Sequence, residues 1–483
     1  MFFKHTFKYW WLLSMVFLFT TIFLYASNST RNSERIICRA IGEQLNKKPE
    51  EVNDNDFKNI ETLDISRKRF SDVNALSKLT SLKILKLNEN ELTNIRPLAN
   101  LKKLRVLELS ATGISDINVL SNLENLEILS LNATKVSDIR VLANLKNLVK
   151  LDLSYFTKIS DISPLASLTN LEDLSLNLTQ VSNVSTLKNL KNLKTVNLDS
   201  TYVSDINALG SLTELKELHL RASKVSDIKA LANLNNLQIF NIGGGNTKII
   251  DINPLAKLIN LQKLSLSNTQ ISDVNALTKL ENLKSLSLYF THVKNISPLA
   301  NLTNLQILNI SGTGINDISY LKDLKNLKTL DISGTKVADI KPLTNLTNLQ
   351  ILDISGTLIS NVNSLAKLTN LRILLFTRGN LKDIRPISKL INLRYLNLAS
   401  TNISDISELE SLKNLEVIII TGTKINELAP LIKMERLKTV VLDENQFTKE
   451  QMDELQKARP QLTIYYHLRE PSLIRLGEMY NDS

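Results

Sequence analysis

The stretch Leu104–Asn125, LRVLELSATGISDINVLSNLEN, contains the pattern that decides the fold. Its residues follow L-x-x-L-x-L-x-x-T-x-I-x-D-I-x-x-L-x-x-L-x-x, and this pattern recurs almost every 22 residues as far as Pro460. Counted from Ile60, there are eighteen copies, of which Leu148–Asn170 and Leu237–Asn260 are longer than the others. Self-similarity at a short, fixed period predicts a solenoid of stacked repeats.

Each copy predicts a short strand followed by a short helical turn. Leu107 and Leu109 alternate with other residues, as in a strand that buries one face. Leu120 and Leu123 are three residues apart and fit a helical turn on the opposite side. No copy can bury these leucines alone, so neighbouring copies must stack. We therefore expect an α/β solenoid, a curved leucine-rich repeat array with a parallel sheet on its concave side and 3-10 or helical turns on its convex side.

Two polar positions recur within the pattern. Eleven copies have Thr at the position of Thr112, where the hydroxyl can bond the backbone as the chain leaves the strand. Twelve copies have Asp at the position of Asp116, and four have Asn there. A row of carboxylates could bind cations, but Asp and Asn share the ability to cap a helical turn. The row also lacks clustered oxygen ligands, so we interpret it as a row of caps and expect no metal.

The repeats carry a family resemblance. The run Ile159–Leu171, ISDISPLASLTNL, and the similar run Val293–Leu305 resemble the short repeats of the bacterial internalins, whose cytosolic relatives include phosphatase-regulating proteins of eukaryotes. The resemblance extends from about Ser33 to Tyr466. It implies the fold directly, and it implies binding of a protein partner whose identity is set by the variable positions.

The amino terminus predicts export. Residues 1–8 are basic, and Tyr9–Ala26 contains no charged residue. Eighteen residues reach about 27 Å as a helix, near the thickness of a bilayer core. Signal cleavage requires small residues at the last and third-last positions, and Leu24 would occupy the latter if Ala26 were last. We therefore expect a signal-anchor or transmembrane helix at 9–26 with the repeats on the extracytoplasmic side. The alternative is a secreted or periplasmic protein after signal cleavage.

Caps are expected at both ends of the repeats, which span 60–460. Residues 27–59 form a spacer and a helical cap, in which Ser33 is expected to cap a helix from Glu34 to about Leu45. At the other end, Phe447–Ala458 predicts a helix with Thr448 as its cap. Residues 461–483 form a closing strand and a tail.

Composition excludes several function classes. The net charge is +10, but Lys and Arg are scattered with few aromatic residues between them, so we expect no nucleic acid partner. The single cysteine, Cys38, excludes an intrachain disulfide framework, and we interpret it as a small packing residue of the amino-terminal cap. The four histidines lack metal-ligand spacing, and no catalytic constellation is visible. We expect neither enzymatic activity nor a cofactor.

Most outward positions of the predicted strands hold small polar residues. The exceptions are aromatic, His and Arg side chains, which are frequent in binding hot spots. Two Tyr-Phe pairs are predicted at corresponding turns, with the alternative that each Phe fills space under its turn. The first set of candidates is Tyr155, Phe156, Tyr202, His219, Arg221, Tyr289, Phe290 and His292.

A second set of candidates lies nearer the carboxyl end. Leu375 and Ile419 take a mid-strand outward position that is polar in most copies, and Tyr395 falls beside it. An exposed apolar stripe suggests a partner. The alternative is that the apolar tail of the same chain covers the stripe.

These observations predict a membrane-anchored, exported protein that recognises another protein through its concave face. We expect the chain to be a monomer that contacts the membrane through residues 9–26. The alternative function is a regulatory or scaffold subunit on the cytoplasmic side, similar to the phosphatase-regulating proteins.

Overall fold

The computed structural model describes residues 31–155, 158–244, 247–381, 383–444 and 446–466. The chain divides after Ala230 into two compact units, unit 1 and unit 2. The predicted anchor at Tyr9–Ala26 and the tail after Tyr466 lie outside the described residues. Within those residues, no helix combines the length and the apolar character that crossing a bilayer requires.

Short parallel strands repeat along both units. In unit 1 they are β1 (Thr62–Asp64), β2 (Ile84–Lys86), β3 (Val106–Glu108), β4 (Ile128–Ser130), β5 (Lys150–Asp152), β6 (Asp173–Ser175), β7 (Thr195–Asn197) and β8 (Glu217–Arg221). In unit 2 they are β9 (Ile239–Gly243), β10 (Lys263–Ser265), β11 (Ser285–Ser287), β12 (Ile307–Asn309), β13 (Thr329–Asp331), β14 (Ile351–Asp353), β15 (Ile373–Leu375), β16 (Tyr395–Asn397), β17 (Val417–Ile419), β18 (Thr439–Leu442) and β19 (Thr463–Tyr466). Within each unit the central leucines pair in register, as Leu107 does with Leu129.

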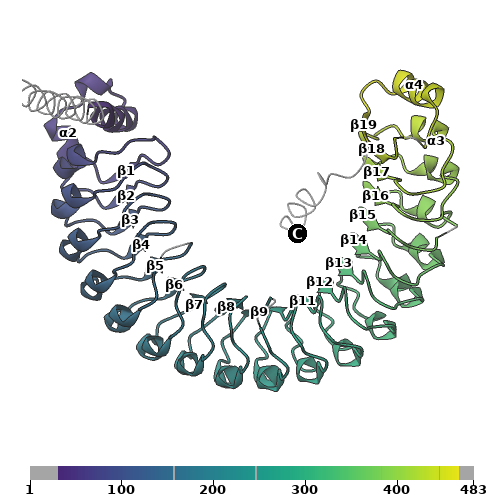
Figure 1. Cartoon of the computed structure of the whole chain (residues 1–483), viewed down its shortest axis with the longest axis horizontal. Coiled ribbons are helices and arrows are strands. Elements are labelled where there is room, and N and C mark those ends of the chain that lie inside the picture. Colours follow the sequence, from purple (N-terminus) through teal and green to yellow (C-terminus); the bar gives the residue numbers. More distant parts are fainter. Residues whose placement is uncertain (1–30, 156–157, 245–246, 382, 445, 467–483) are drawn as a thin grey trace, which may run out of the picture. The chain divides into compact units, whose positions relative to one another are not determined.

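Helical turns alternate with the strands. The 3-10 helices are η1 (Pro49–Glu51), η2 (Asn74–Lys78), η3 (Arg96–Asn100), η4 (Asn118–Asn122), η5 (Arg140–Asn144), η6 (Ser163–Ser167), η7 (Ser185–Asn189), η8 (Asn207–Ser211), η9 (Lys229–Asn233), η10 (Asn253–Lys257), η11 (Asn275–Leu277), η12 (Ser297–Leu299), η13 (Ser319–Leu321), η14 (Lys341–Asn345), η15 (Asn363–Lys367), η16 (Ile387–Lys389) and η17 (Ser407–Ser411). Within each unit the strands line the inner side of the curve and these turns line the outer side (Figure 1).

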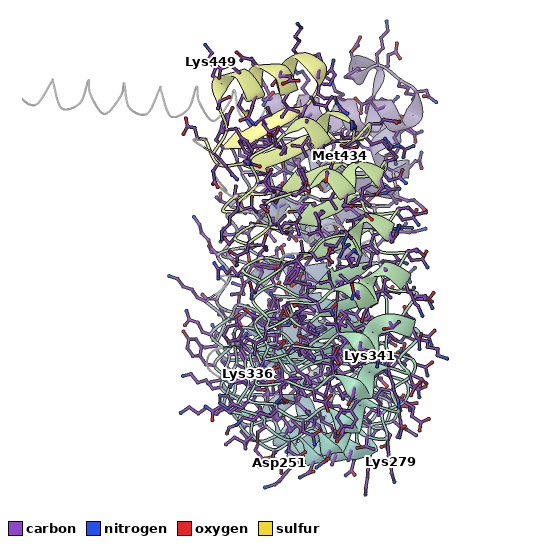
Figure 2. All side chains as sticks on the ribbon, turned by 90° about the vertical axis from the view of Figure 1, so that its right-hand side faces the viewer. Asp251, Lys279, Lys336, Lys341, Met434 and Lys449 are labelled. Carbon is purple, nitrogen blue, oxygen red and sulfur yellow. The ribbon has the colours of Figure 1, made fainter. Side chains whose placement is uncertain are left out.

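The core is a column of apolar side chains shared by neighbouring repeats. In the copy that begins at Leu104, the side chains of Leu107, Leu109, Ile114 and Leu120 are all fully buried. Charged side chains stand off the surface, as Lys336 and Lys341 do in unit 2, whereas Met434 is buried (Figure 2). The predicted solenoid, with its inner strands and outer turns, is confirmed.

The threonine row closes each strand as predicted. The Thr112 hydroxyl donates to the Leu109 carbonyl at 2.7 Å, and the backbone of Ala111 just before it is left-handed, with φ of 55°. The same hydroxyl bond recurs at every one of the eleven threonines: Thr112, Thr134, Thr179, Thr201, Thr269, Thr291, Thr313, Thr335, Thr357, Thr401 and Thr423. These hydroxyls satisfy carbonyls that the short strands leave unpaired.

The acidic row caps the outer turns. Asp116 Oδ1 accepts a hydrogen bond from the Asn118 N–H, the first residue of η4, at 3.0 Å. Asn makes the equivalent hydrogen bond, since Asn183 Oδ1 accepts from the Ser185 N–H at 2.9 Å. The bond is present at all sixteen positions: Asp72, Asn94, Asp116, Asp138, Asp161, Asn183, Asp205, Asp227, Asp251, Asp273, Asn295, Asp317, Asp339, Asn361, Asp383 and Asp405. The interpretation of this row as caps is confirmed.

The amino-terminal cap differs from the prediction in one residue. Residues 31–45 are helical, so Ser33 lies inside the helix and does not cap it. Ser33 is buried, and its hydroxyl accepts a hydrogen bond from the Asp72 N–H at 3.3 Å. Ile37 and Ile41 are fully buried, which covers the open end of the repeats. Cys38 is half-buried, and burial raises the pKa of its thiol.

The rest of the cap regions is built from three short α-helices. α2 (Asp54–Asn59) precedes β1, and α3 (Ala429–Ile432) replaces a 3-10 turn in the last repeat. α4 (Lys449–Ala458) begins after Thr448, whose hydroxyl accepts from the Gln451 N–H as predicted. Its Leu455 is fully buried, and β19 pairs with β18, so the predicted helix and strand at this end are confirmed.

Candidate functional site

Most of the aromatic candidates lie just beyond the carboxyl ends of strands. Tyr155 follows β5, Tyr202 follows β7, and Tyr289 and Phe290 follow β11. Because the strands of a unit are parallel, such residues gather at one edge of its sheet. All four side chains are exposed. Phe156 lies outside the described residues, so its role stays a prediction.

The two Tyr-Phe pairs are not equivalent, which corrects the prediction. Tyr155 has a left-handed backbone, with φ of 63°, and its N–H donates to the Asn177 carbonyl. Phe290, not Tyr289, takes the corresponding conformation, with φ of 52° and a bond from its N–H to the Ser311 carbonyl. Counted from the first leucine of each repeat, Tyr155 and Phe290 occupy the same position, and the extra residue of the first long repeat comes after Tyr155.

Phe290 is a surface residue. Its side chain is 57% exposed, so the alternative that it fills space under the turn is wrong. Its ring makes an edge contact with Tyr289, with centroids 4.7 Å apart. The ring also lies over Gly312, where an added Cβ would come within 2.7 Å of Phe290 Cδ2. Glycine in the next repeat thus leaves room for the ring. His292, two residues along, is also exposed.

A polar cluster joins β7 and β8 in unit 1. The Arg221 N–H donates to Asp199 Oδ1 at 2.6 Å, and His219 Nε2 lies 3.9 Å from Glu217 Oε2. Burial raises the pKa of the Asp199 carboxyl, against the lowering effects of the Arg221 N–H and the nearby His219 and Arg221. Tyr202 stands close by in sequence and is covered on one face by Lys224 Nζ, 4.8 Å from its ring centroid. The sequence prediction found His219 and Arg221 but missed Asp199.

Side chains of adjacent repeats cover most of the predicted apolar stripe. Ile419 is 1% exposed, because Ala399 and Val441 of the adjacent repeats pack against it. The prediction that Ile419 is exposed is therefore wrong. Leu375 and Tyr395 are half-buried against Ile351 and Ile373 on neighbouring strands. Strands about 4.8 Å apart bring bulky outward side chains into contact with one another. Only Leu375 and Tyr395 among these candidates still present surface.

Asp353 stands beside this apolar cluster. Its position in β14 pairs with Asp331 on one side and Leu375 on the other. Burial raises the pKa of the Asp353 carboxyl to about 6, and the charge of Asp331 adds to the effect. The Ser355 N–H donates to Asp353 Oδ1 at 2.8 Å, and this hydrogen bond acts to lower the pKa. A carboxylate with a raised pKa is a candidate for a functional role, and the apolar pattern alone gave no signal of it.

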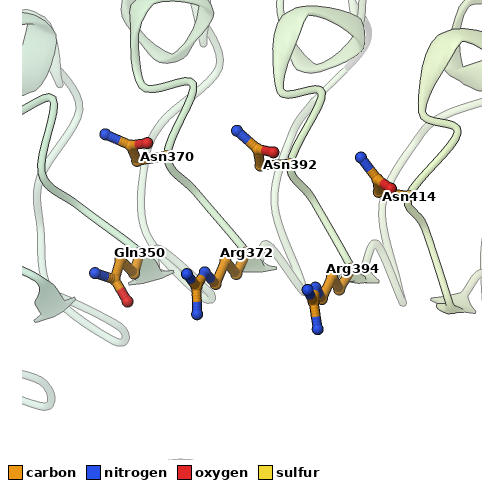
Figure 3. Close-up of a pocket in the computed structure, with 6 residues that line it drawn as sticks. All are labelled: Gln350, Asn370, Arg372, Asn392, Arg394 and Asn414. Carbon is orange, nitrogen blue, oxygen red and sulfur yellow. The ribbon is translucent and has the colours of Figure 1, made fainter.

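A polar groove borders the same strands. Its lining residues come from three successive repeats and enclose about 370 Å³ (Figure 3). They are Gln350, Asn370, Arg372, Asn392, Arg394 and Asn414. The sequence prediction missed this groove, because Arg372 and Arg394 are 22 residues apart and become neighbours only when the repeats are aligned.

Replacing Asp353 by Asn tests its buried charge. The folded-state pKa of about 6 lies above the ordinary 3.8, so this group makes the protein less stable as pH rises from about 4 to about 6. Asn keeps the acceptor for the Ser355 N–H and removes the charge. At about pH 7.5 we expect Asp353→Asn to raise the free energy of unfolding by at most about 3 kcal/mol.

Urea denaturation of the two proteins at both pH values is the measurement. At about pH 4 the wild-type carboxyl is largely protonated in the folded state, so the two proteins should have the same stability. A variant that is equally destabilised at both pH values would show that Asp353 is not held with a raised pKa.

Comparisons with known proteins agree with this architecture. The model described as "Leucine-rich repeat region" matches residues 59–247, and the model "Leucine Rich repeats (2 copies)" matches residues 259–301, 303–345, 325–367 and 391–433. No match was found among curated proteins.

Three solved structures illustrate the likeness. An internalin from Listeria monocytogenes is 27% identical over 77% of this chain and 95% of its own, with a TM-score of 0.57. A leucine-rich repeat protein of Leptospira interrogans is 22% identical over 86% of this chain and 97% of its own, with a TM-score of 0.64. A plant peptide hormone receptor, solved in complex with RGF2, is 18% identical over 85% of this chain and 80% of its own, with a TM-score of 0.61. The last two show a shared fold only.

The matched ranges of the two repeat models together span most of the chain, and an internalin is among the similar structures. The chain is therefore an internalin-like leucine-rich repeat protein.

Proposed function

We propose that this chain recognises another protein through side chains on the inner strand face and at the carboxyl-end edge of the strands. The exposed contact pair Tyr289–Phe290 is the observation that carries the proposal. Exposing two large aromatic rings to water is unfavourable, and rings of this kind are frequent anchors in protein interfaces. No buried role accounts for the Phe290 ring.

The repeat frame suits this function because it holds the anchors rigidly. The Phe290 N–H donates to the Ser311 carbonyl of the next repeat, and the His292 N–H donates to the Ile271 carbonyl of the previous one. The Thr291 hydroxyl closes the turn by donating to the Leu288 carbonyl at 2.7 Å. Side chains that are ordered before binding lose little entropy when a partner docks. The plant receptor with a similar fold was solved with a bound peptide, which supports recognition of a polypeptide here.

We propose no catalytic role. Among the described residues, no group of three or more His, Cys, Asp or Glu side chains is placed to hold a metal ion. The single thiol, Cys38, has a raised pKa, which disfavours the reactive thiolate. A leucine-rich repeat solenoid acts chiefly as a scaffold for protein interactions. Hydrolytic or transferase activity of the purified chain would contradict this part of the proposal.

We further propose that the repeats are exported and anchored by Tyr9–Ala26. The support is the sequence itself, which has eighteen uncharged residues after a basic start. The competing function is a regulatory or scaffold subunit on the cytoplasmic side. The anchored protein and the cytoplasmic subunit differ in the side of the membrane on which the repeats lie. Signal cleavage would give a third form, secreted or periplasmic, that has lost residues 9–26.

Protease accessibility distinguishes these possibilities. In cells that express the full chain, an external protease should digest the repeats once any outer barrier is opened, while Met1–Ala26 stays attached and is detected by mass spectrometry. Loss of that segment would indicate a cleaved signal. Repeats that remain protected inside the cell would refute export and favour the cytoplasmic scaffold.

Replacing both Tyr289 and Phe290 by Ala tests the recognition surface. Both side chains are exposed, and Ala111 and Ala133 occupy the position of Phe290 in other repeats, so the melting temperature should change little. The affinity for the partner recovered by affinity capture should fall by at least about tenfold, as for loss of a hot spot.

Lys336→Ala, an exposed residue of another repeat of unit 2, is the matched control and should leave capture unchanged. Unchanged capture by the double variant would remove these residues from the site. A large drop in melting temperature would instead show that the rings are structural.

A further inference from the structure

One row of side chains in unit 2 carries uncompensated positive charge. The row consists of the residue after the first leucine of each repeat, and from β10 to β16 it contains only Gln, Lys and Arg: Gln262, Lys284, Gln306, Lys328, Gln350, Arg372 and Arg394. The backbone keeps these residues in register, since the Arg372 N–H donates to the Gln350 carbonyl and the Arg394 N–H to the Arg372 carbonyl, both at 2.8 Å. Neighbouring side chains in the row therefore stand about 4.8 Å apart at their bases.

In the same row of unit 1, three of the four cations are paired with carboxylates, and only Lys216 has no ion pair among the described residues. Lys83 Nζ pairs with Glu61 at 2.7 Å, Arg105 Nε pairs with Glu127 at 2.7 Å, and Lys194 Nζ pairs with Glu172 at 2.6 Å. In each case the carboxylate comes from the same row of an adjacent repeat. Intrachain partners thus satisfy these cations, which leaves little charge for a ligand.

Arg372 and Arg394 are different. Arg372 has no carboxylate partner among the described residues, and Arg394 reaches only Glu416, at 3.9 Å. Glu416 is already held by Lys438 at 2.6 Å. Two guanidinium groups therefore stand in adjacent repeats, and the one carboxylate near them, Glu416, lies in the repeat beyond Arg394. Like charges placed side by side on a sheet are destabilising, so an anion bound between them would relieve the repulsion.

Hydrogen bonds hold the side chains that form the other wall of the groove. Figure 3 shows Arg372 and Arg394 side by side along one wall, with Asn370, Asn392 and Asn414 along the other. Each of these amides is fixed by a hydrogen bond from its Nδ2 to the backbone of the previous repeat: to Thr347, Thr369 and Ile391, at 2.8 Å to 2.9 Å. Each Nδ2 retains a second hydrogen. The groove thus has guanidinium groups on one side and Asn amide groups on the other.

Two partly exposed apolar side chains follow the two arginines closely in sequence. Tyr395 follows Arg394 in β16, and Leu375 lies on β15 three residues after Arg372; both side chains are half-buried. A sulfated polymer would gain nothing from Tyr395 and Leu375, whereas a polypeptide with an acidic side chain near an apolar one matches both surfaces. The combination favours a protein ligand.

We propose that the groove between Arg372 and Arg394 binds a carboxylate of an acidic, partly apolar segment of the partner protein. This inference rests on the proposed function and adds the chemistry of the partner. A guanidinium binds a carboxylate through two parallel N–H bonds, so the site selects a carboxylate geometry as well as negative charge.

A binding assay with a defined acidic polypeptide tests the proposal. The probe is a fluorescein-labelled random copolymer of Glu and Tyr, titrated with the full chain in detergent at about 100 mM NaCl and followed by fluorescence anisotropy. The test variant is Arg372→Gln with Arg394→Gln. The matched control is Lys83→Gln with Arg105→Gln, which removes the same charge from the same row where the cations are paired.

The test variant should bind the copolymer at least about tenfold more weakly, because charge-assisted hydrogen bonds are lost. The control should change the affinity less than about twofold, because its cations are already paired. A third variant, Arg372→Lys with Arg394→Lys, keeps the charge but loses the forks and should fall between the two. Melting temperatures of all variants check that each is folded.

Three results would overturn the proposal. The wild-type chain could fail to bind the copolymer, or the test and control variants could weaken binding equally, which would indicate only general charge. Labelled heparin, run in parallel, could depend on Arg372 and Arg394 while the copolymer does not, which would assign the groove to a sulfated polymer. The capture experiment with Tyr289 and Phe290 does not depend on any of these results, so the proposed function is tested separately.

Discussion

The burial of leucine side chains between neighbouring repeats is the interaction on which every other feature depends. Leu107 and Leu129 lie in register on adjacent strands, and both are fully buried in the column of side chains that neighbouring repeats share. Burying one such side chain contributes about 2 kcal/mol. A strand of three residues, such as β3, has too few hydrogen bonds to persist alone, so stability comes from the interfaces between repeats.

The threonine row and the Asp or Asn row fix the backbone of each repeat, and they leave the side chain at some other positions unconstrained. The threonine hydroxyls end the strands and the Asp or Asn side chains start the turns, as Thr112 and Asp116 do. Directly before the threonine position lies the left-handed position, which is Ala in some repeats, Gly in others, and Tyr155 or Phe290 in two. The frame demands a backbone conformation there and no particular side chain. Such positions can therefore vary without loss of the fold, which is why recognition residues accumulate at them.

The period, the inward leucines and the roles of the threonine and Asp rows could all be predicted from the sequence, because each is a property of one repeat. The errors concern contacts between repeats. Ile419 looked exposed in its own strand, and only Ala399 and Val441 on the adjacent strands bury it. Ser33 looked like a cap, but its partner is Asp72, in another element. The neighbourhood of Arg372 and Arg394 was missed for the same reason, since it appears only when equivalent positions are compared between repeats.

Deleting one whole repeat tests most directly whether shared burial between equivalent repeats holds the chain together. Removing residues 316–337 takes out one repeat of about 22 residues and joins Ile315 to Ala338 in the same register. The account predicts a folded protein with a circular dichroism spectrum per residue like that of the full chain. Removing residues 316–326 alone breaks the register and should unfold the repeats around it. If both deletions unfold the chain alike, the repeats are not interchangeable units and the account is wrong.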